Sequence, residues 1–205
     1  MIVVVLVAAV VTLGYFGLNV GKSEPLPVLF DAPRYSWQNQ EGQTVSSESM
    51  RSKVVLANFI FTNCTDICPA ILTPKMLEQR DSLAKAGLLG KDVQLISFSV
   101  DPEHDTPPVL AEYAGRYGVE GTDWQFLTSS TSGEQEMHRV VVEGFHLAVQ
   151  PLHDVHDGGD ASAIAHSGQF VLIDKQNRVR ALYDPAEMSP DDVLRDVRQL
   201  IAEGS

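Results

Sequence analysis

The chain has 205 residues, enough for one well-packed domain once an apolar amino terminus is set aside. Its 44% hydrophobic and 20% charged residues are ordinary for a globular protein, so the composition excludes a chain that is disordered throughout. The net charge of −12, with no run of Lys and Arg, argues against a nucleic-acid partner, because binding phosphates requires a basic surface.

Residues 1–21, MIVVVLVAAVVTLGYFGLNVG, are uncharged and mostly apolar. About 20 apolar residues are needed to cross a bilayer, whereas the core of a cleavable signal peptide has roughly 7–15. No convincing small-x-small cleavage motif follows the run, and no cysteine follows that could take a lipid. We therefore expect an uncleaved, single-pass membrane anchor. The run lacks basic residues before it, so the positive-inside rule gives no orientation.

Residues 22–33 contain three prolines, which keep the segment out of a helix and predict an extended linker. The soluble domain is then expected over residues 34–205. It opens with YSWQNQEGQTVS, an alternating pattern around Gly42 that predicts a β-hairpin at a sheet edge. The following KVVLANFIF, residues 53–61, is a near-continuous apolar run typical of a central strand buried on both faces.

The rest of the chain alternates predicted helices with predicted strands. Residues 69–87 have helical spacing, with Pro74 ending the first turn or kinking the helix; residues 93–101 form a second buried strand. A helix follows from DTPP, with Asp105 or Thr106 as its N-cap. The later elements are a strand in WQFLT, a short helix in SGEQEMHRVVVEG, a hairpin around Gln176-Asn177 and a terminal helix capped by Ser189.

This order of elements predicts an α/β protein. The arrangement β–α–β–α–β–β–α matches a thioredoxin-like three-layer sandwich with an insertion, an amino-terminal β-hairpin extension and one transmembrane helix in front. In such a fold Cys64 and Cys68 fall between a central strand and the helix that follows it.

Cys64 and Cys68 are the two cysteines of the chain, and they lie in FTNCTDICPA. A pair so close in sequence is compatible with a metal clamp, a redox couple or a small structural disulfide. The start of a helix favours the thiolate, which is both the nucleophile and the metal ligand. A disulfide closing so short a loop removes little entropy from the unfolded chain, which argues against a purely structural role.

Three segments together, FTNCTDICP, SVDPEHDTPPVLAEYAGRYG and AHSGQFVLID, resemble the Sco/SenC family of copper-binding, thioredoxin-like oxidase assembly proteins. The resemblance runs from about residue 27 to the end, and a membrane anchor in front is also usual in that family. Cys-x-x-x-Cys-Pro alone is a weak signal, but the VDP…DTP segment and the histidine before a late strand make the combination specific.

The resemblance implies that Cys64, Cys68 and His166 bind copper. Two thiolates and one imidazole suit Cu(I), and with an added ligand they accommodate Cu(II). A closed structural zinc site would need four protein ligands, one more than this set supplies.

Other polar residues near these motifs have simpler interpretations. We expect Asp105 to cap its helix and Asp101 to be structural or to support the ligands. The loop before His166 also holds His146, His153 and His156, any of which copper could recruit, although solvated loop histidines are the simpler expectation. The chain departs from the family at Thr65, where proline is frequent, and at His104, where a basic residue is common.

The function implied by the resemblance is that of a membrane-anchored copper chaperone on the extracytoplasmic, periplasmic side. It would deliver copper to the dinuclear copper site of a respiratory oxidase subunit, and its own copper could come from another carrier. In this reading the protein is a metallochaperone and not an enzyme.

Two enzymatic alternatives remain. In a thiol–disulfide reductase, Cys64 would attack a partner disulfide and Cys68 would resolve the mixed disulfide. Two features argue against a general thiol–disulfide oxidoreductase that acts on many partners. The cysteines are separated by one residue more than in Cys-x-x-Cys, and His166-Ser167 stands before FVLID in place of a proline. A peroxidase would use Thr62 two residues before Cys64, but the proline and arginine that complete such a site have no evident counterpart.

Overall fold

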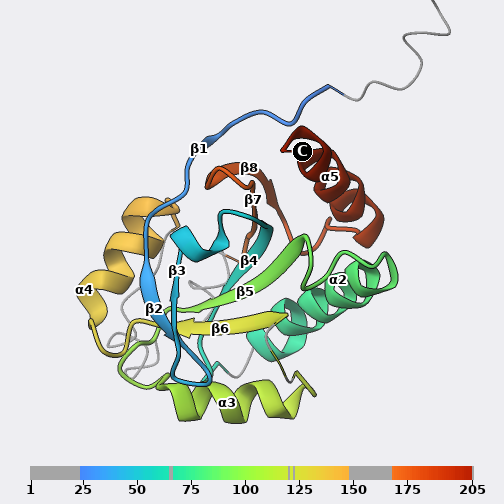
Figure 1. Cartoon of the computed structure of the whole chain (residues 1–205). Helices are drawn as coiled ribbons and strands as arrows, with labels where there is room; N and C mark the ends of the chain where they lie inside the picture. The colour runs from blue at the N-terminus through green and yellow to red at the C-terminus, as the bar shows by residue number, and fades with distance from the viewer. Residues whose placement is uncertain (1–23, 65–66, 120, 122, 148–167, 205) are drawn as a thin grey trace, which may run out of the picture.

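The computed structural model describes residues 24–64, 67–119, 121, 123–147 and 168–204. These residues form one eight-stranded sheet with helices on both faces (Figure 1). The apolar run expected to be an anchor lies outside the described residues. Within the described ranges, the helices are too short or too polar to cross a bilayer.

The strand order is β1-β8-β7-β4-β5-β6-β2-β3. Strands β4, β5 and β6 are parallel, and the remaining pairings are antiparallel. The bounds are β1 Phe30–Asp31, β2 Ser36–Asn39, β3 Thr44–Ser46, β4 Val54–Ile60, β5 Val93–Ser99, β6 Trp124–Thr128, β7 Phe170–Ile173 and β8 Arg178–Tyr183. Every residue of β4 and of β5 is buried, as the predictions of two buried strands required.

Helices cover both faces of this sheet. They are η1 Glu48–Met50, η2 Cys68–Leu72, α2 Thr73–Lys85, α3 Pro107–Arg116, α4 Glu134–Met137, η3 His138–Gly144 and α5 Pro190–Glu203. Helices α2, α3 and α5 share one face, where Thr73 bonds Tyr113 and Tyr113 packs on Phe126 (Figure 1). Helix η3 lies on the other face, where Phe145 packs on Phe59 and Phe98. The three-layer α/β arrangement predicted from the sequence is therefore confirmed.

The amino-terminal hairpin is confirmed as β2 and β3, joined across Gly42, whose φ of 75° lies in the left-handed region that glycine tolerates. The segment expected to be a linker is extended, but its last residues belong to the sheet. Phe30 and Asp31 pair with Val179 and Arg178, and Ala32 is buried. This pairing was not predicted, because the surrounding prolines favour extended backbone without specifying a partner strand.

The core is continuous and lies within residues 32–200. On one face it is aromatic, since Tyr35, Trp37, Phe59, Phe98 and Phe145 pack ring against ring with centroids 5.0–6.5 Å apart. A chain that begins at Lys22 therefore retains this core and can be studied by itself.

Candidate metal and thiol site

The two cysteines lie where β4 gives way to the helix on its carboxyl-terminal side. Cys64 follows β4 by four residues, and Cys68 opens η2, a π-helical turn in which the Thr73 N–H donates to the Cys68 carbonyl. The helix predicted over residues 69–87 is therefore a π turn followed by an α-helix. Pro69 and Pro74, which lack an N–H, each lie in the opening turn of one of these two parts, where a donor is least needed.

The turn brings the two thiols together. The Cys68 N–H donates to the Cys64 sulfur with an N···S distance of 3.3 Å, and both cysteines are thiols without a disulfide. Cys64 is half-buried, whereas the Cys68 side chain is only 1% exposed. A backbone N–H at the start of a helix stabilises negative charge on the sulfur that accepts it. The pair thus has one outer and one inner sulfur.

The inner thiol is held in its protonated form. Its hydrogen bond with Cys64, together with burial, raises the pKa of the Cys68 thiol far above its ordinary value. A soft cation that replaces this proton would relieve both effects, because it supplies positive charge between the two sulfurs.

A buried carboxyl supports the segment that leads into Cys64. Asp105 has no exposed surface. It accepts the Thr62 N–H at 3.1 Å and the Thr62 hydroxyl at 2.5 Å, and it accepts the Ser99 hydroxyl at 2.6 Å. Burial raises the pKa of the Asp105 carboxyl, and it outweighs the hydrogen bonds from Ser99 and Thr62, which lower that pKa.

The prediction that Asp105 caps α3 is wrong. The N-cap residue is Thr106, without a side-chain cap bond, and the Asp105 carboxyl faces Thr62 and Ser99 instead. Asp101 is structural, as expected, because its carboxylate accepts the His104 N–H at 3.3 Å and closes the turn after β5.

His166, the third expected ligand, lies outside the described residues, as do His153, His156 and Thr65. Within the described ranges, His, Cys, Asp and Glu side chains form no group of three that could hold a metal. His146 is exposed, has a left-handed backbone with φ of 59°, and packs edge-on against Phe30 at 4.9 Å. His104 is exposed on the turn before α3.

Sequence reasoning found the cysteines but missed the Thr62–Asp105–Ser99 group. Thr62 and Asp105 are 43 residues apart, and their pairing depends on β4 and β5 being parallel neighbours. The π turn did leave a trace in the sequence, since Pro69 and Pro74 are five residues apart, the separation of the two residues that a π-helical i→i+5 hydrogen bond joins.

Known proteins are similar to this chain in sequence. The SCO1/SenC family model matches residues 30–202. The SCO1 protein homolog of Bacillus subtilis is 34% identical over 173 residues, which cover 84% of this chain and 83% of the relative. Protein SenC of Rhodobacter capsulatus is 28% identical over 160 residues, which cover 78% of this chain and 65% of the relative.

Solved structures of Sco proteins also resemble this chain. The structure of BsSco, described as a member of the Sco family of cytochrome c oxidase assembly proteins with a disulfide switch, superposes with a TM-score of 0.72. It is 32% identical and covers 87% of this chain and 97% of its own. Copper-bound ScoI of Bradyrhizobium japonicum shares the fold, with a TM-score of 0.61 and 22% identity over 83% of this chain and 99% of its own. The chain belongs to the SCO1/SenC family.

Proposed function

We propose that the protein is a copper chaperone, in which Cys64, Cys68 and His166 bind one copper ion and deliver it to the dinuclear copper site of a respiratory oxidase subunit. The observation that carries this proposal is the thiol pair itself. The two cysteines meet where β4 gives way to η2, and the Cys68 N–H donates to the Cys64 sulfur with an N···S distance of 3.3 Å. Thiolates are the preferred ligands of Cu(I).

Family membership supports the cargo and the partner. BsSco is described as belonging to a family of cytochrome c oxidase assembly proteins, and ScoI of Bradyrhizobium japonicum was solved with copper bound. In the proposal residues 1–21 anchor the protein in the membrane, with the domain on the extracytoplasmic side. Copper would arrive from another carrier.

Release would proceed by ligand exchange. A thiolate of the acceptor approaches the copper from solvent and displaces Cys64 first, because Cys64 is the more exposed sulfur. Cys68, buried beneath it, leaves last and regains its proton. The copper keeps its oxidation state, and the number of thiolates bound to it is conserved at each exchange.

The test mixes the copper-loaded domain, residues 22–205, with a metal-free oxidase fragment that carries the dinuclear site. We expect copper to move to the fragment when its thiols are reduced, and to stay on the domain when those thiols are alkylated. Measuring the copper content of each protein after separation decides between these outcomes. Retention of copper on the domain beside a reduced acceptor would contradict the delivery step.

A second candidate is a thiol–disulfide reductase restricted to the same partner. The outer and inner positions of Cys64 and Cys68 suit an attacking and a resolving thiol, and a disulfide switch is described for BsSco. In this reaction two electrons and two protons pass to the partner disulfide, and a Cys64–Cys68 disulfide forms. Mixing the metal-free, reduced domain with the oxidised fragment tests it, because only a reductase generates free thiols on the fragment.

A further inference from the structure

The segment through which the chain enters the domain is fastened at both ends. We call residues 24–29 the strap. Gln199 donates to the Glu24 carbonyl at 2.9 Å, and the Leu29 N–H donates to the Val179 carbonyl at 2.9 Å. Between these points the buried guanidinium of Arg180 donates to the carbonyls of residues 26 and 27. The entry point is thereby fixed beside the carboxyl-terminal half of α5 (Figure 1).

Exposed apolar side chains gather at the strap. The described part of the chain has four large hydrophobic residues that are strongly exposed, and two of them are neighbours on the strap. Val28 is 50% exposed and Leu29 is 45% exposed. Apolar groups that stay exposed together mark a contact surface.

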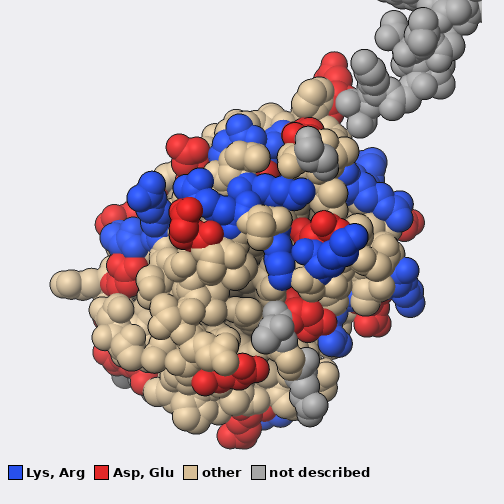
Figure 2. Space-filling view, viewed as in Figure 1, with Lys and Arg blue, Asp and Glu red and all other residues tan. Residues whose placement is uncertain are grey.

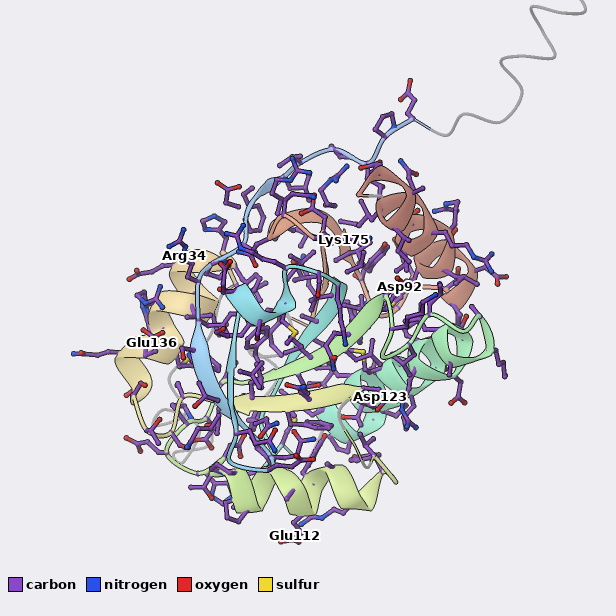
Figure 3. The ribbon with its side chains drawn as sticks, viewed as in Figure 1. Arg34, Asp92, Glu112, Asp123, Glu136 and Lys175 are labelled. Atoms are coloured by element: carbon purple, nitrogen blue, oxygen red, sulfur yellow. The ribbon has the colours of Figure 1, made fainter. Side chains whose placement is uncertain are left out.

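Basic residues gather at the same end of the sheet. The registers of β4 with β7 and with β5 bring Lys53, Lys175 and Asp92 to one end of the strands. At the same end Asp31 of β1 lies opposite Arg178 of β8 in the strand register. Figure 2 shows Lys and Arg across the upper half of the visible face, below the point where the chain leaves. Arg34 and Lys175 are labelled there in Figure 3.

The apolar run lies close by in sequence. It covers residues 1–21, so only residues 22 and 23 separate it from the strap. The chain from residue 21 to residue 24 spans at most roughly 11 Å even when fully extended. A bilayer that holds the run would therefore lie within that distance of Glu24, and the strap end is the part of the domain nearest to it.

From these observations we infer that the strap end docks on the anionic phospholipid headgroups of the membrane. Exposed Val28 and Leu29 enter the interface, and Arg34 and Lys175 meet the headgroup phosphates. The thiols follow the opposite, carboxyl-terminal end of β4, whose seven residues span about 23 Å. Docking therefore holds Cys64 away from the bilayer and turned toward partners in the aqueous phase. The inference rests on the membrane anchor of the proposed function but not on copper binding, so vesicle sedimentation and copper transfer test the two separately.

The test is sedimentation of the domain, residues 22–205, with vesicles of phosphatidylcholine alone or mixed with phosphatidylglycerol. We expect binding to the mixed vesicles that weakens as salt is raised. The double variant Arg34→Gln/Lys175→Gln should lose roughly 30-fold in partition coefficient. The matched control Lys75→Gln/Arg116→Gln makes the same change in net charge on helices α2 and α3, and it should change the partition coefficient less than twofold. Leu29→Ser, which leaves the charge unchanged, should lower it by a few-fold.

Three results would overturn the inference. They are no binding of the unmodified domain to anionic vesicles, equal binding to both vesicle types, and an equal loss in the test and control double variants. The last result would show that net charge, and not the strap end, governs the contact.

Discussion

At the scale of single residues, Asp105 connects the thiol segment to the sheet. It has no exposed surface, and it accepts hydrogen bonds from Thr62, two residues before Cys64, and from Ser99 at the end of β5. It therefore holds the chain in place just before the outer thiol. A buried carboxyl with such partners is costly to disturb, because its donors would be left unsatisfied.

Asp105→Ala should lower the free energy of unfolding by about 2–4 kcal/mol, since it leaves the Thr62 N–H and the Ser99 hydroxyl without their acceptor. Urea denaturation under reducing conditions measures this. Asp101→Ala is the matched control; it removes a single hydrogen bond of 3.3 Å at a half-buried site and should cost less than about 1 kcal/mol. Equal losses in the two variants would show that Asp105 has no special structural role.

The same carboxyl predicts a pH dependence. Burial raises the pKa of Asp105 from its ordinary value of 3.8, so the folded state holds the proton more tightly than the unfolded state. Its contribution is most favourable below pH 3.8 and is lost as pH rises through the raised, folded-state pKa. The stability of the wild type should therefore fall relative to that of Asp105→Asn as pH rises through this window. A difference between the two proteins that is independent of pH would contradict the raised pKa.

The two thiols should differ in reactivity. Cys64 is partly exposed, whereas Cys68 is 1% exposed, so that burial both shields its thiol from reagents and, even with Cys64 replaced, still raises its pKa. In the native, reduced domain, iodoacetamide should modify Cys64 in Cys68→Ser at least tenfold faster than it modifies Cys68 in Cys64→Ser. Mass spectrometry of timed samples gives both rates, and denatured samples control for intrinsic reactivity. Similar native rates would mean that the sulfurs are not divided into an outer and an inner one.

At the scale of elements, Arg180 of β8 connects the strap with the end of α5. Arg180 is 4% exposed and forms ion pairs with Asp174 at 2.9 Å and with Glu203 at 2.8 Å, besides its bonds to the strap carbonyls. Burial raises the pKa of the Asp174 carboxyl, but hydrogen bonds from Arg178 and Arg180 outweigh it, so the pKa is lowered overall. The planar guanidinium can reach all of these acceptors, which a lysine could not.

Arg180→Leu should cost about 3–5 kcal/mol of unfolding free energy, because it leaves the buried Asp174 carboxylate without one of its partners. Arg198→Leu, at an exposed position of α5, is the control and should change stability by less than about 0.5 kcal/mol. The stabilisation that Asp174 contributes is present above its ordinary pKa and is lost as pH falls through its lowered, folded-state pKa. The gap between wild type and Arg180→Leu should therefore narrow in acid, and a constant gap would argue against the ion pair.

Much of the element order could be predicted from the sequence because local signals were strong. Ser189 caps α5 by accepting the Asp192 N–H, and Asn177 adopts the left-handed φ of 63° that its hairpin needs. The strand β1 could not be predicted, since it has two residues and its existence depends on partners 147 and 149 positions away. The same limit applies to the site. Two cysteines four positions apart are visible in the sequence, but the hydrogen bonds of Asp105 to the segment before Cys64 become apparent only once β4 and β5 are paired.

At the scale of the whole molecule, the sheet separates two ends with different chemistry. The thiols lie past the carboxyl end of β4. The strap, with exposed Val28 and Leu29, lies toward the other end, where Figure 2 shows Lys and Arg across the upper half of the visible face. We propose that the strap end binds the membrane surface and that the thiol end exchanges copper. The chain as a whole carries a net charge of −12.

The central claim, that the thiol pair is a copper site, is tested most directly by an anaerobic Cu(I) titration of the domain, residues 22–205, against a competing chelator. The wild type should bind one copper ion tightly when reduced. It should lose that binding when the thiols are oxidised to a disulfide, because a disulfide offers no thiolate. Cys64→Ser should abolish tight binding and His166→Ala should weaken it, while the control His104→Ala leaves it unchanged. Equal affinity before and after oxidation, or tight binding that survives Cys64→Ser, would contradict the account.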